Sequence, residues 1–388
     1  MDGYIERDMS AAVLEAAGVY PVITVTGPRQ SGKTTLVRHL FPGLPYRSLE
    51  NPDVRRLALS DPVGFLHEGP EGMVLDEVQR CPQLLSYIQG LTDERPDLRY
   101  VLSGSSNFAM MQSVTQSLAG RTAVFELLPL SLGEVMGAAE GLTLDELLLR
   151  GLYPAAWGRA IVPGMLYPNY VRTYLERDVR DLLAVKDLNA FQRFVRLCAA
   201  RIGSVFNASE LSGELGVSVH TVRSWLSVLE ASYIVVLLQP FYANTRKRLT
   251  KSPKLYFVDT GLACSLLDID SVSTLRRDKM RGHLFENLIV MEALKRRYNV
   301  GRGNNLCFYR DSNGNEVDLI TRVEGALSLY EVKSSETYHP DFEKGIKRFC
   351  AEFPNQVGSC AVVYAGELES MGRSIKLMNY KTFVRHGA

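Results

Sequence analysis

The sequence has no long apolar run, few cysteines and almost no net charge. No apolar stretch approaches the length that a helix needs to cross a bilayer, so we expect no membrane-spanning segment. The first ten residues carry four charged side chains and no apolar core, which is unlike a signal peptide. The six cysteines are scattered without a C-x-x-C pair, which argues against a disulfide framework or a zinc site and fits a reducing cytoplasm. With a net charge of +1, any binding to nucleic acid must come from local basic patches.

What is present has the composition of an ordinary globular protein. The 388 residues, 46% hydrophobic and 22% charged, suffice for two or three domains with their own cores. In the first part of the chain, short apolar runs alternate with helical stretches, which predicts an α/β fold with a parallel sheet covered by helices. The predicted strands are residues 22–26, 73–75, 100–102 and 123–127.

A glycine-rich loop lies between the predicted strand 22–26 and an amphipathic stretch that ends at Leu40. It matches G-x-x-x-x-G-K-T in its strand–loop–helix context, with the residues Gly27, Pro28, Arg29, Gln30, Ser31, Gly32, Lys33, Thr34 and Thr35. The glycines let backbone N–H groups wrap phosphates, and the helix N-terminus adds a partial positive charge. We expect Lys33 to reach the β- and γ-phosphates and Thr34 to bind magnesium. The loop therefore predicts a site for a nucleoside triphosphate, ATP with magnesium.

An acidic pair follows the next predicted strand, at Asp76 and Glu77. We expect Asp76 beside the magnesium ion and Glu77 as the base that polarises the attacking water. A base of this kind suits hydrolysis better than transfer to a small-molecule hydroxyl, which disfavours a kinase. Ser103 or Ser105 is expected to orient the water, although a plain helix cap is an alternative. Arg121 is a candidate for stabilising charge on phosphate from a neighbouring subunit, and its alternative is a solvated surface arginine.

The middle of the chain has the pattern of a winged helix-turn-helix. Helices are predicted at 188–202 and 208–215, then a turn, a helix capped by Ser218 that ends at Ala231, and strands at 233–238 and 255–258. Candidate contacts to DNA or RNA phosphates lie on the third helix and in the strand-connecting loop, namely His220, Arg223, Arg246, Lys247, Arg248 and Lys251, with Lys254 shortly after them. The alternative is that this segment is a subunit contact or a lid.

The last part of the chain combines one helix, predicted at 284–297, with strands at 306–309, 316–321, 327–333 and 361–364. Residues two apart in a strand point to the same face, so Glu331 and Lys333 project together, and pairing with the neighbouring strand would bring Asp318 to them. Two carboxylates can hold magnesium, and a lysine can stabilise an attacking water or a scissile phosphate. This mixed α/β segment resembles the core of PD-(D/E)xK nucleases.

Glu286 is a fourth candidate of the same site. It shares its side of the predicted helix with Ile289, Val290 and Ala293, and a carboxylate among apolar neighbours is costly unless it is paired or binds a metal. The nuclease resemblance also implies a helical glutamate upstream. The candidate metal ligands are therefore Glu286, Asp318 and Glu331, and the alternative is a satisfied ion pair in a domain that has lost cleavage.

Several segments together resemble a large prokaryotic family of AAA-type P-loop ATPases followed by a conserved C-terminal region of unknown function. They are residues 27–36, 75–80, 102–106, 118–121, 128–134, 151–154, 174–178 and 254–262. The resemblance implies an ATPase core at 1–135, a helical lid or linker at 136–186, a winged helix at 187–265 and a nuclease-like domain at 275–388. It also implies a homo-oligomer in which an arginine completes the neighbour's site.

Two functions of different classes follow. The first is an AAA-type ATPase coupled to a nucleic-acid-binding half, with metal-dependent nuclease cleavage as one outcome. The second is a nucleotide-dependent switch or scaffold that binds protein partners and carries an inactive nuclease-like domain.

Overall fold

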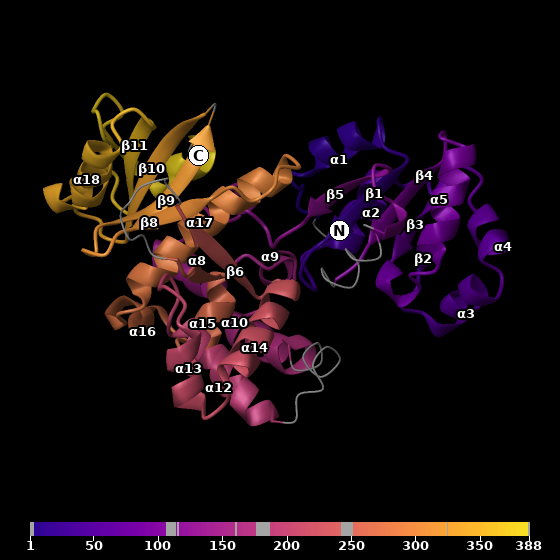
Figure 1. The fold of residues 1–388 in the computed structure, drawn as a ribbon, viewed down its shortest axis with the longest axis horizontal. Coiled ribbons are helices and arrows are strands. Elements are labelled where there is room, and N and C mark those ends of the chain that lie inside the picture. The colour runs from indigo at the N-terminus through magenta and orange to yellow at the C-terminus, as the bar shows by residue number, and fades with distance from the viewer. Residues whose placement is uncertain are drawn as a thin grey trace. The chain divides into compact units, whose positions relative to one another are not determined.

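The computed structural model describes residues 4–105, 114, 116–159, 161–175, 187–241, 251–323 and 325–386 (Figure 1). The chain forms two compact units. The first consists of Met1–Leu130, Ala231–Tyr233 and Lys295–Gly303, and the second of Ser131–Glu230, Ile234–Leu294 and Asn304–Ala388. The predicted division into four segments stays a prediction.

A five-stranded parallel sheet forms the centre of the first unit. Its order is β2-β3-β4-β1-β5, with β1 at Val22–Thr26, β2 at Tyr46–Ser48, β3 at Gly72–Asp76, β4 at Arg99–Ser103 and β5 at Thr122–Glu126. The four predicted strands are confirmed to within one residue at each end, whereas β2 is an addition. The expected α/β class and parallel sheet are therefore present.

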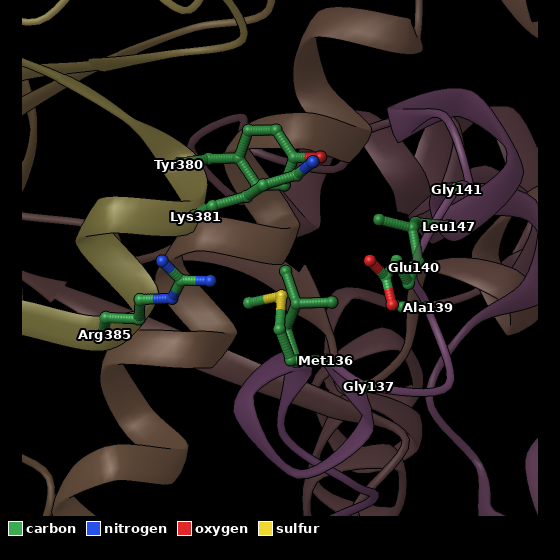
Figure 2. A pocket seen from close by; sticks show the side chains of 10 residues that line it. Met136, Gly137, Ala139, Glu140, Gly141, Leu147, Tyr380, Lys381 and Arg385 are labelled. Carbon is green, nitrogen blue, oxygen red and sulfur yellow. The ribbon is translucent and has the colours of Figure 1, made fainter.

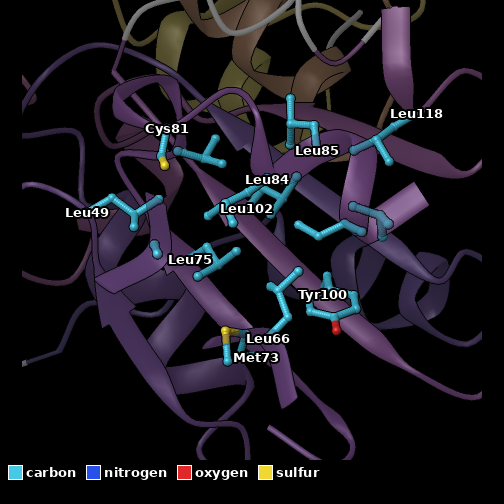
Figure 3. Packing of buried hydrophobic residues seen from close by; sticks show 14 of the residues in the cluster. Leu49, Leu66, Met73, Leu75, Cys81, Leu84, Leu85, Tyr100, Leu102 and Leu118 are labelled. Carbon is cyan, nitrogen blue, oxygen red and sulfur yellow. The ribbon is translucent and has the colours of Figure 1, made fainter. Parts of the chain in front are cut away.

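Helices cover both faces of this sheet. They are α1 (Ser10–Ala17), α2 (Lys33–Leu40), α3 (Pro52–Ser60), α4 (Pro62–His67) and α5 (Leu84–Glu94), with a 3₁₀ turn at Val78–Arg80. Alternate strand residues point to opposite faces, so Met73 and Leu75 pack with α3, α4 and α5, while Val74 packs with α1 and α2. Figure 3 shows Met73 and Leu75 with Leu66 of α4 and Leu84 of α5. A sheet buried on both faces needs continuous apolar strands, which is why β3 and β4 could be recognised in the sequence.

The second unit begins with helices. They are α7 (Leu132–Val135), α8 (Leu144–Arg150), α9 (Pro154–Gly158), α10 (Pro163–Tyr170) with a last helical turn at Val171–Leu175, α12 (Leu188–Ala199), α13 (Ala208–Leu215), α14 (Val219–Ala231), α15 (Thr260–Leu266) and α16 (Val272–Arg277). The helical character predicted for 136–186 is present as far as 175, and 176–186 lie outside the described residues. Ser218 caps α14 as predicted, because its hydroxyl accepts a hydrogen bond of 3.0 Å from the backbone N–H of Thr221.

A seven-stranded mixed sheet completes the second unit. Its order is β12-β11-β10-β9-β8-β6-β7, with β6 at Val235–Pro240, β7 at Lys254–Phe257, β8 at Cys307–Arg310, β9 at Glu316–Val323, β10 at Ala326–Lys333, β11 at Val357–Tyr364 and β12 at Lys376–Asn379. The remaining elements are α17 (Arg281–Asn299), whose residues from Lys295 onward belong to the first unit, a 3₁₀ turn at Pro340–Glu343, α18 (Lys344–Glu352) and α19 (Tyr380–His386). The pair β6–β7 is antiparallel, and β6 also pairs in parallel with β8. The two strands predicted as a wing therefore belong to the same sheet as the C-terminal strands.

Two further features concern the chain as a whole. Among the helices that the structure describes, none combines the length and the apolar character needed to cross a membrane. All six cysteines are free thiols.

Candidate functional site

The glycine-rich loop takes a backbone path that suits glycine. Gly27 has φ 146° and Gly32 has φ 96°, and Gln30 between them has φ 61°. A Cβ atom on Gly27 would lie 2.1 Å from the carbonyl oxygen of Leu127, so a larger residue would clash with backbone. Helix α2 begins at Lys33, directly after Gly32. The predicted strand–loop–helix arrangement is thus realised at the carboxyl end of β1.

Lys33 is buried against this loop. Its Nζ donates hydrogen bonds to the carbonyl oxygens of Gly27 at 2.9 Å and Pro28 at 2.6 Å. Burial lowers the pKa of Lys33 to about 8, and the nearby carboxylates Glu77 and Asp76 oppose that shift only in part. The hydrogen-bond acceptors of this ammonium are neutral carbonyl groups, which favours the approach of an anion.

Asp76 collects three hydroxyl groups at the carboxyl end of β3. Its Oδ2 accepts hydrogen bonds of 2.8 Å from Thr34 Oγ1 and from the Tyr46 hydroxyl. Its Oδ1 accepts a hydrogen bond from Ser103, the last residue of β4. Burial and Asp76 raise the pKa of the Tyr46 phenol, which keeps that group a donor. The structure thus brings Thr34, Asp76 and Ser103 together, and their roles at a bound nucleotide stay predictions.

Glu77 has a strained backbone beside this network. Its φ of 56° lies in the left-handed region, where a residue other than glycine is uncommon. Its Oε2 accepts hydrogen bonds from the Gln79 amide and, at 3.3 Å, from the Ser105 hydroxyl. The two serines singled out in the sequence therefore each contact one member of the acidic pair. Gln79 was not predicted, although it lies only two residues after Glu77 in the sequence.

Arg121 lies away from this network. It precedes β5, and its carbonyl oxygen accepts a hydrogen bond from the N–H of Val22 at the start of β1, whereas the loop follows the end of β1. Five residues of strand, roughly 16 Å, separate the two edges of the sheet. The Arg121 guanidinium forms an ion pair with Asp93, with Nε 2.6 Å from Oδ1. It does not reach the phosphate loop of its own chain, and a role in a neighbour's site stays a prediction.

Two residues that the motifs did not reveal support the loop. Arg7 is 5% exposed, and its guanidinium donates hydrogen bonds of 2.8 Å to the carbonyl oxygens of Ser31 and Leu128. The Tyr233 hydroxyl shares a hydrogen bond of 2.7 Å with that of Thr26, the residue before Gly27. No local sequence pattern marks either contact, because the partners are distant along the chain.

Two of the residues predicted to contact nucleic acid lie on helix α14. His220 and Arg223 are exposed, while Val222 and Leu229 of the same helix are buried. Lys251 is also exposed. Arg246, Lys247 and Arg248 lie outside the described residues.

The C-terminal candidates form one cluster. Asp318 on β9 accepts a hydrogen bond of 2.9 Å from the Val332 N–H on β10. Lys333 Nζ lies 2.6 Å from Glu331 Oε1 and 3.9 Å from Asp318 Oδ2. Burial and the neighbouring Asp318 raise the pKa of Glu331 to about 8. Glu286 on α17 is the fourth predicted residue of this cluster. It is linked to the other three by Lys254.

The structure places Lys254 differently from the expectation based on the sequence. The sequence placed it shortly after the basic loop, with the candidate phosphate contacts, but its side chain is buried among the carboxylates, and its Nζ lies 2.9 Å from Glu286 Oε1. Within the described residues, no three His, Cys, Asp or Glu side chains are arranged to hold a metal ion. The cluster as it stands therefore does not fit the expected magnesium site.

A separate hollow of the second unit contains no residue predicted to be functional. This cavity of about 340 Å³ lies between the α7–α8 segment and α19 (Figure 2). Leu132, Met136 and Leu147 contribute apolar surface, and Lys381 and Arg385 contribute cationic ends.

Comparisons with known proteins divide the chain in three. Residues 19–136 match the family described as an AAA domain, and residues 141–273 and 281–383 match two domains of unknown function. The uncharacterized protein Rv2008c of Mycobacterium tuberculosis is 33% identical over 369 residues, covering 93% of this chain and 80% of the relative. The uncharacterized protein MJ1544 of Methanocaldococcus jannaschii is 23% identical over 366 residues, covering 83% and 78%.

Among solved structures, the Walker-type ATPase of Pyrococcus abyssi aligns with 14% identity and a TM-score of 0.43, covering 68% of this chain and 96% of that chain. Similarity of this degree does not establish a shared fold. The AAA-domain match confirms the predicted AAA-type P-loop core, and the two other matches confirm a C-terminal region of unknown function. The chain belongs to the family of the mycobacterial relative, a family of AAA-type P-loop proteins whose C-terminal part consists of domains of unknown function.

Proposed function

We propose that this protein binds ATP with magnesium at residues 27–34 and hydrolyses it, with Glu77 as the general base. One observation carries the proposal, namely the hydrogen bond of 2.8 Å between Thr34 and Asp76 at the carboxyl edge of the sheet. It joins the end of the phosphate loop to the end of β3, where Glu77 follows. A loop that served only as a turn would not require Asp76 and Glu77 at the carboxyl edge of the sheet.

The residues at this edge fit magnesium. The ion prefers hard oxygen ligands, which the Thr34 hydroxyl and the Asp76 carboxylate supply. When bound, it would neutralise negative charge on the phosphates. Lys33 would bind phosphate oxygens, and Glu77 would take the proton of the attacking water. Ser105 holds Glu77 through a hydrogen bond of 3.3 Å and so positions the base.

Two variants test the proposal against a matched control. We expect Lys33→Ala to weaken ATP binding and Glu77→Gln to retain ATP while slowing hydrolysis by about 10²-fold or more. Glu94→Gln, an exposed glutamate near the end of α5, should leave both unchanged. Binding is measured by calorimetry and hydrolysis by phosphate release. Equal turnover by Glu77→Gln and the unaltered protein would remove Glu77 as the base.

We further propose that the C-terminal part binds nucleic acid through α14. The exposed His220 and Arg223 on one face of this helix support the proposal, as does the exposed Lys251. Phosphate contacts weaken as salt rises, so Arg223→Ala should lower the affinity for DNA or RNA and reduce its salt dependence. Arg277→Ala, an exposed arginine on α16, is the control. Identical binding curves for both variants would instead favour the alternative, a nucleotide-dependent scaffold for protein partners.

Cleavage of nucleic acid by Asp318, Glu331 and Lys333 receives less support. Lys254 lies among the carboxylates that a metal ion would need, and this favours an inactive nuclease-like domain. If Asp318→Ala abolished a magnesium-dependent cleavage of DNA or RNA, the domain would be an active nuclease.

Two further expectations complete the proposal. Homo-oligomers in which Arg121 completes a neighbour's site are supported by the AAA-type match. A loss of ATP turnover in Arg121→Ala with unchanged ATP affinity would agree with this role. The six free thiols support a cytoplasmic location, where thiols stay reduced.

A further inference from the structure

Lys254 is one of the least exposed charged residues in the structure. It begins β7, and its side chain is 1% exposed. An isolated ammonium this deeply buried would lose its proton or destabilise the fold unless carboxylates compensate it. The groups around Lys254 therefore decide what it does.

Three carboxylates from two elements surround the ammonium. Lys254 Nζ lies 2.9 Å from Glu286 Oε1 on α17 and 3.8 Å from Asp318 Oδ1 on β9. Glu316, also on β9, forms a third ion pair with it. The face of the Phe308 ring lies beneath it, with its centroid 5.4 Å from Nζ. A cation already occupies the space between the helical glutamate and the strand aspartate.

Glu286 is enclosed from its other sides as well. Its Oε1 also accepts a hydrogen bond of 2.6 Å from the Tyr256 hydroxyl. Its Oε2 faces the loop before α13, where a Cβ atom on Gly203 would lie only 3.2 Å from it. Gly203 has φ 70°, so the absence of a side chain lets the loop backbone pass close to this carboxylate. A hydrated divalent ion would have to displace either the lysine or this loop.

The other carboxylates have partners of their own. Asp318 Oδ2 accepts the backbone hydrogen bond from Val332, and Glu331 Oε1 faces Lys333. Arg310 Nη1 lies 3.4 Å from Glu316 Oε2. Four carboxyl groups thus face three cations, which leaves at most one formal negative charge and a weak electrostatic attraction for a divalent ion. Glu331 Oε2 is the one buried oxygen of these four side chains without a hydrogen-bond partner among the described residues.

We propose that Lys254 is the resident cation of this cluster, which ties β7 to α17 and β9 without a metal ion. The ammonium takes the place between Glu286 and Asp318 that a nuclease would give to a divalent ion. It follows that divalent cations compete with Lys254 for these carboxylates. The proposal is independent of ATP hydrolysis and of nucleic-acid contact by α14.

The first test compares manganese uptake by the unaltered full-length protein and by Asp318→Asn, both without nucleotide. Free Mn²⁺ is followed by its electron paramagnetic resonance signal during titration. We expect equal uptake, because the Asp318 site is held by Lys254. One Mn²⁺ per chain that is lost in Asp318→Asn would overturn the proposal, whether or not any lysine variant folds.

The second test removes the lysine charge while keeping its apolar stem. Lys254→Met should lower the melting temperature, because it leaves Glu286 buried without its ammonium partner. Adding Glu286→Gln removes that uncompensated charge and should recover part of the loss. Lys279→Met, an exposed lysine shortly before α17, is the control for the substitution itself.

Lys254→Met should also gain a Mn²⁺ site that Asp318→Asn removes. If the melting temperature of Lys254→Met equalled that of Lys279→Met, the proposal would be overturned.

Discussion

Lys33 carries a charge whose only hydrogen-bond partners in the loop are neutral carbonyl groups. Its pKa is lowered to about 8 by burial, from 10.5. Between these values the unfolded chain binds a proton that the folded chain lacks, so the folded state gains stability as pH rises through this window. Phosphate favours the charged lysine, so the affinity for ATP should fall above pH 8, approaching about tenfold per pH unit. Calorimetric titrations from pH 7 to pH 9.5 measure this.

The control for this prediction is Lys33→Arg, because an arginine stays protonated throughout the range. Its affinity, although lower, should not change above pH 8. An ATP affinity of the unaltered protein that stays constant to pH 9.5 would show that Lys33 is not the titrating group.

Arg7 supplies buried donors to the phosphate loop. Replacing it by methionine retains an apolar stem but removes the donors to the carbonyl oxygens of Ser31 and Leu128. Buried acceptors that lose their donor cost about 1–3 kcal/mol, so urea unfolding should show a loss of this size and ATP affinity should fall. Arg56→Met, at an exposed position paired with Asp53, should change neither. Unchanged ATP affinity in Arg7→Met would limit Arg7 to a role in stability.

Residues that meet because they follow neighbouring strand ends could be predicted. Thr34, Asp76 and Ser103 are of this kind, because parallel strands place their carboxyl ends at one edge of the sheet. Arg7 and Lys254 could not, because their partners lie 121 residues away at Leu128 and 32 residues away at Glu286. A lysine beside a basic loop has no feature in the sequence that distinguishes a buried ammonium from a solvated one.

At the scale of elements, the turn between β1 and α2 depends on a close backbone approach at Gly27. Gly27→Ala would place a methyl group 2.1 Å from the Leu127 carbonyl oxygen and impose a strained φ of 146°. We expect a loss of ATP binding and a lower melting temperature for the first unit. Gly43→Ala is the matched control, because an added Cβ there meets nothing within 4 Å. If Gly27→Ala bound ATP with the same affinity as Gly43→Ala, the loop could not lie as close to the Leu127 backbone in solution as it does in the structure.

The strands were predictable from the sequence to different degrees. Those of the first sheet are short, apolar on both faces and flanked by loops, which distinguishes them from helices. The pairing of β6 with β8 was not predictable, because only Gln239–Cys307 and Pro240–Phe308 are paired. Neither residue pair has a composition that marks a parallel partner 68 residues away. For that reason the wing was predicted as a separate segment although its strands join the C-terminal sheet.

At the scale of the whole molecule, each of the two compact units has a hydrophobic core of its own. Leu75 and Leu102 belong to a core in the first unit, and Leu329 and Phe349 to one in the second. All residues of the proposed ATP site lie in the first unit, and the Lys254 cluster lies in the second. A ligand that binds only one unit should therefore stabilise that unit alone.

Thermal unfolding with and without ATP and magnesium tests this separation. A ligand stabilises the state that binds it by RT ln(1 + [L]/Kd), about 2.7 kcal/mol at a hundredfold excess over Kd. We expect calorimetry to resolve two transitions, of which ATP raises only the one lowered by Gly27→Ala. Lys254→Met should lower only the other, and Lys33→Ala should remove the ATP shift while leaving both transitions visible. A single transition that ATP and Lys254→Met move together would mean that the two units unfold as one, and that nucleotide binding is felt at the C-terminal cluster.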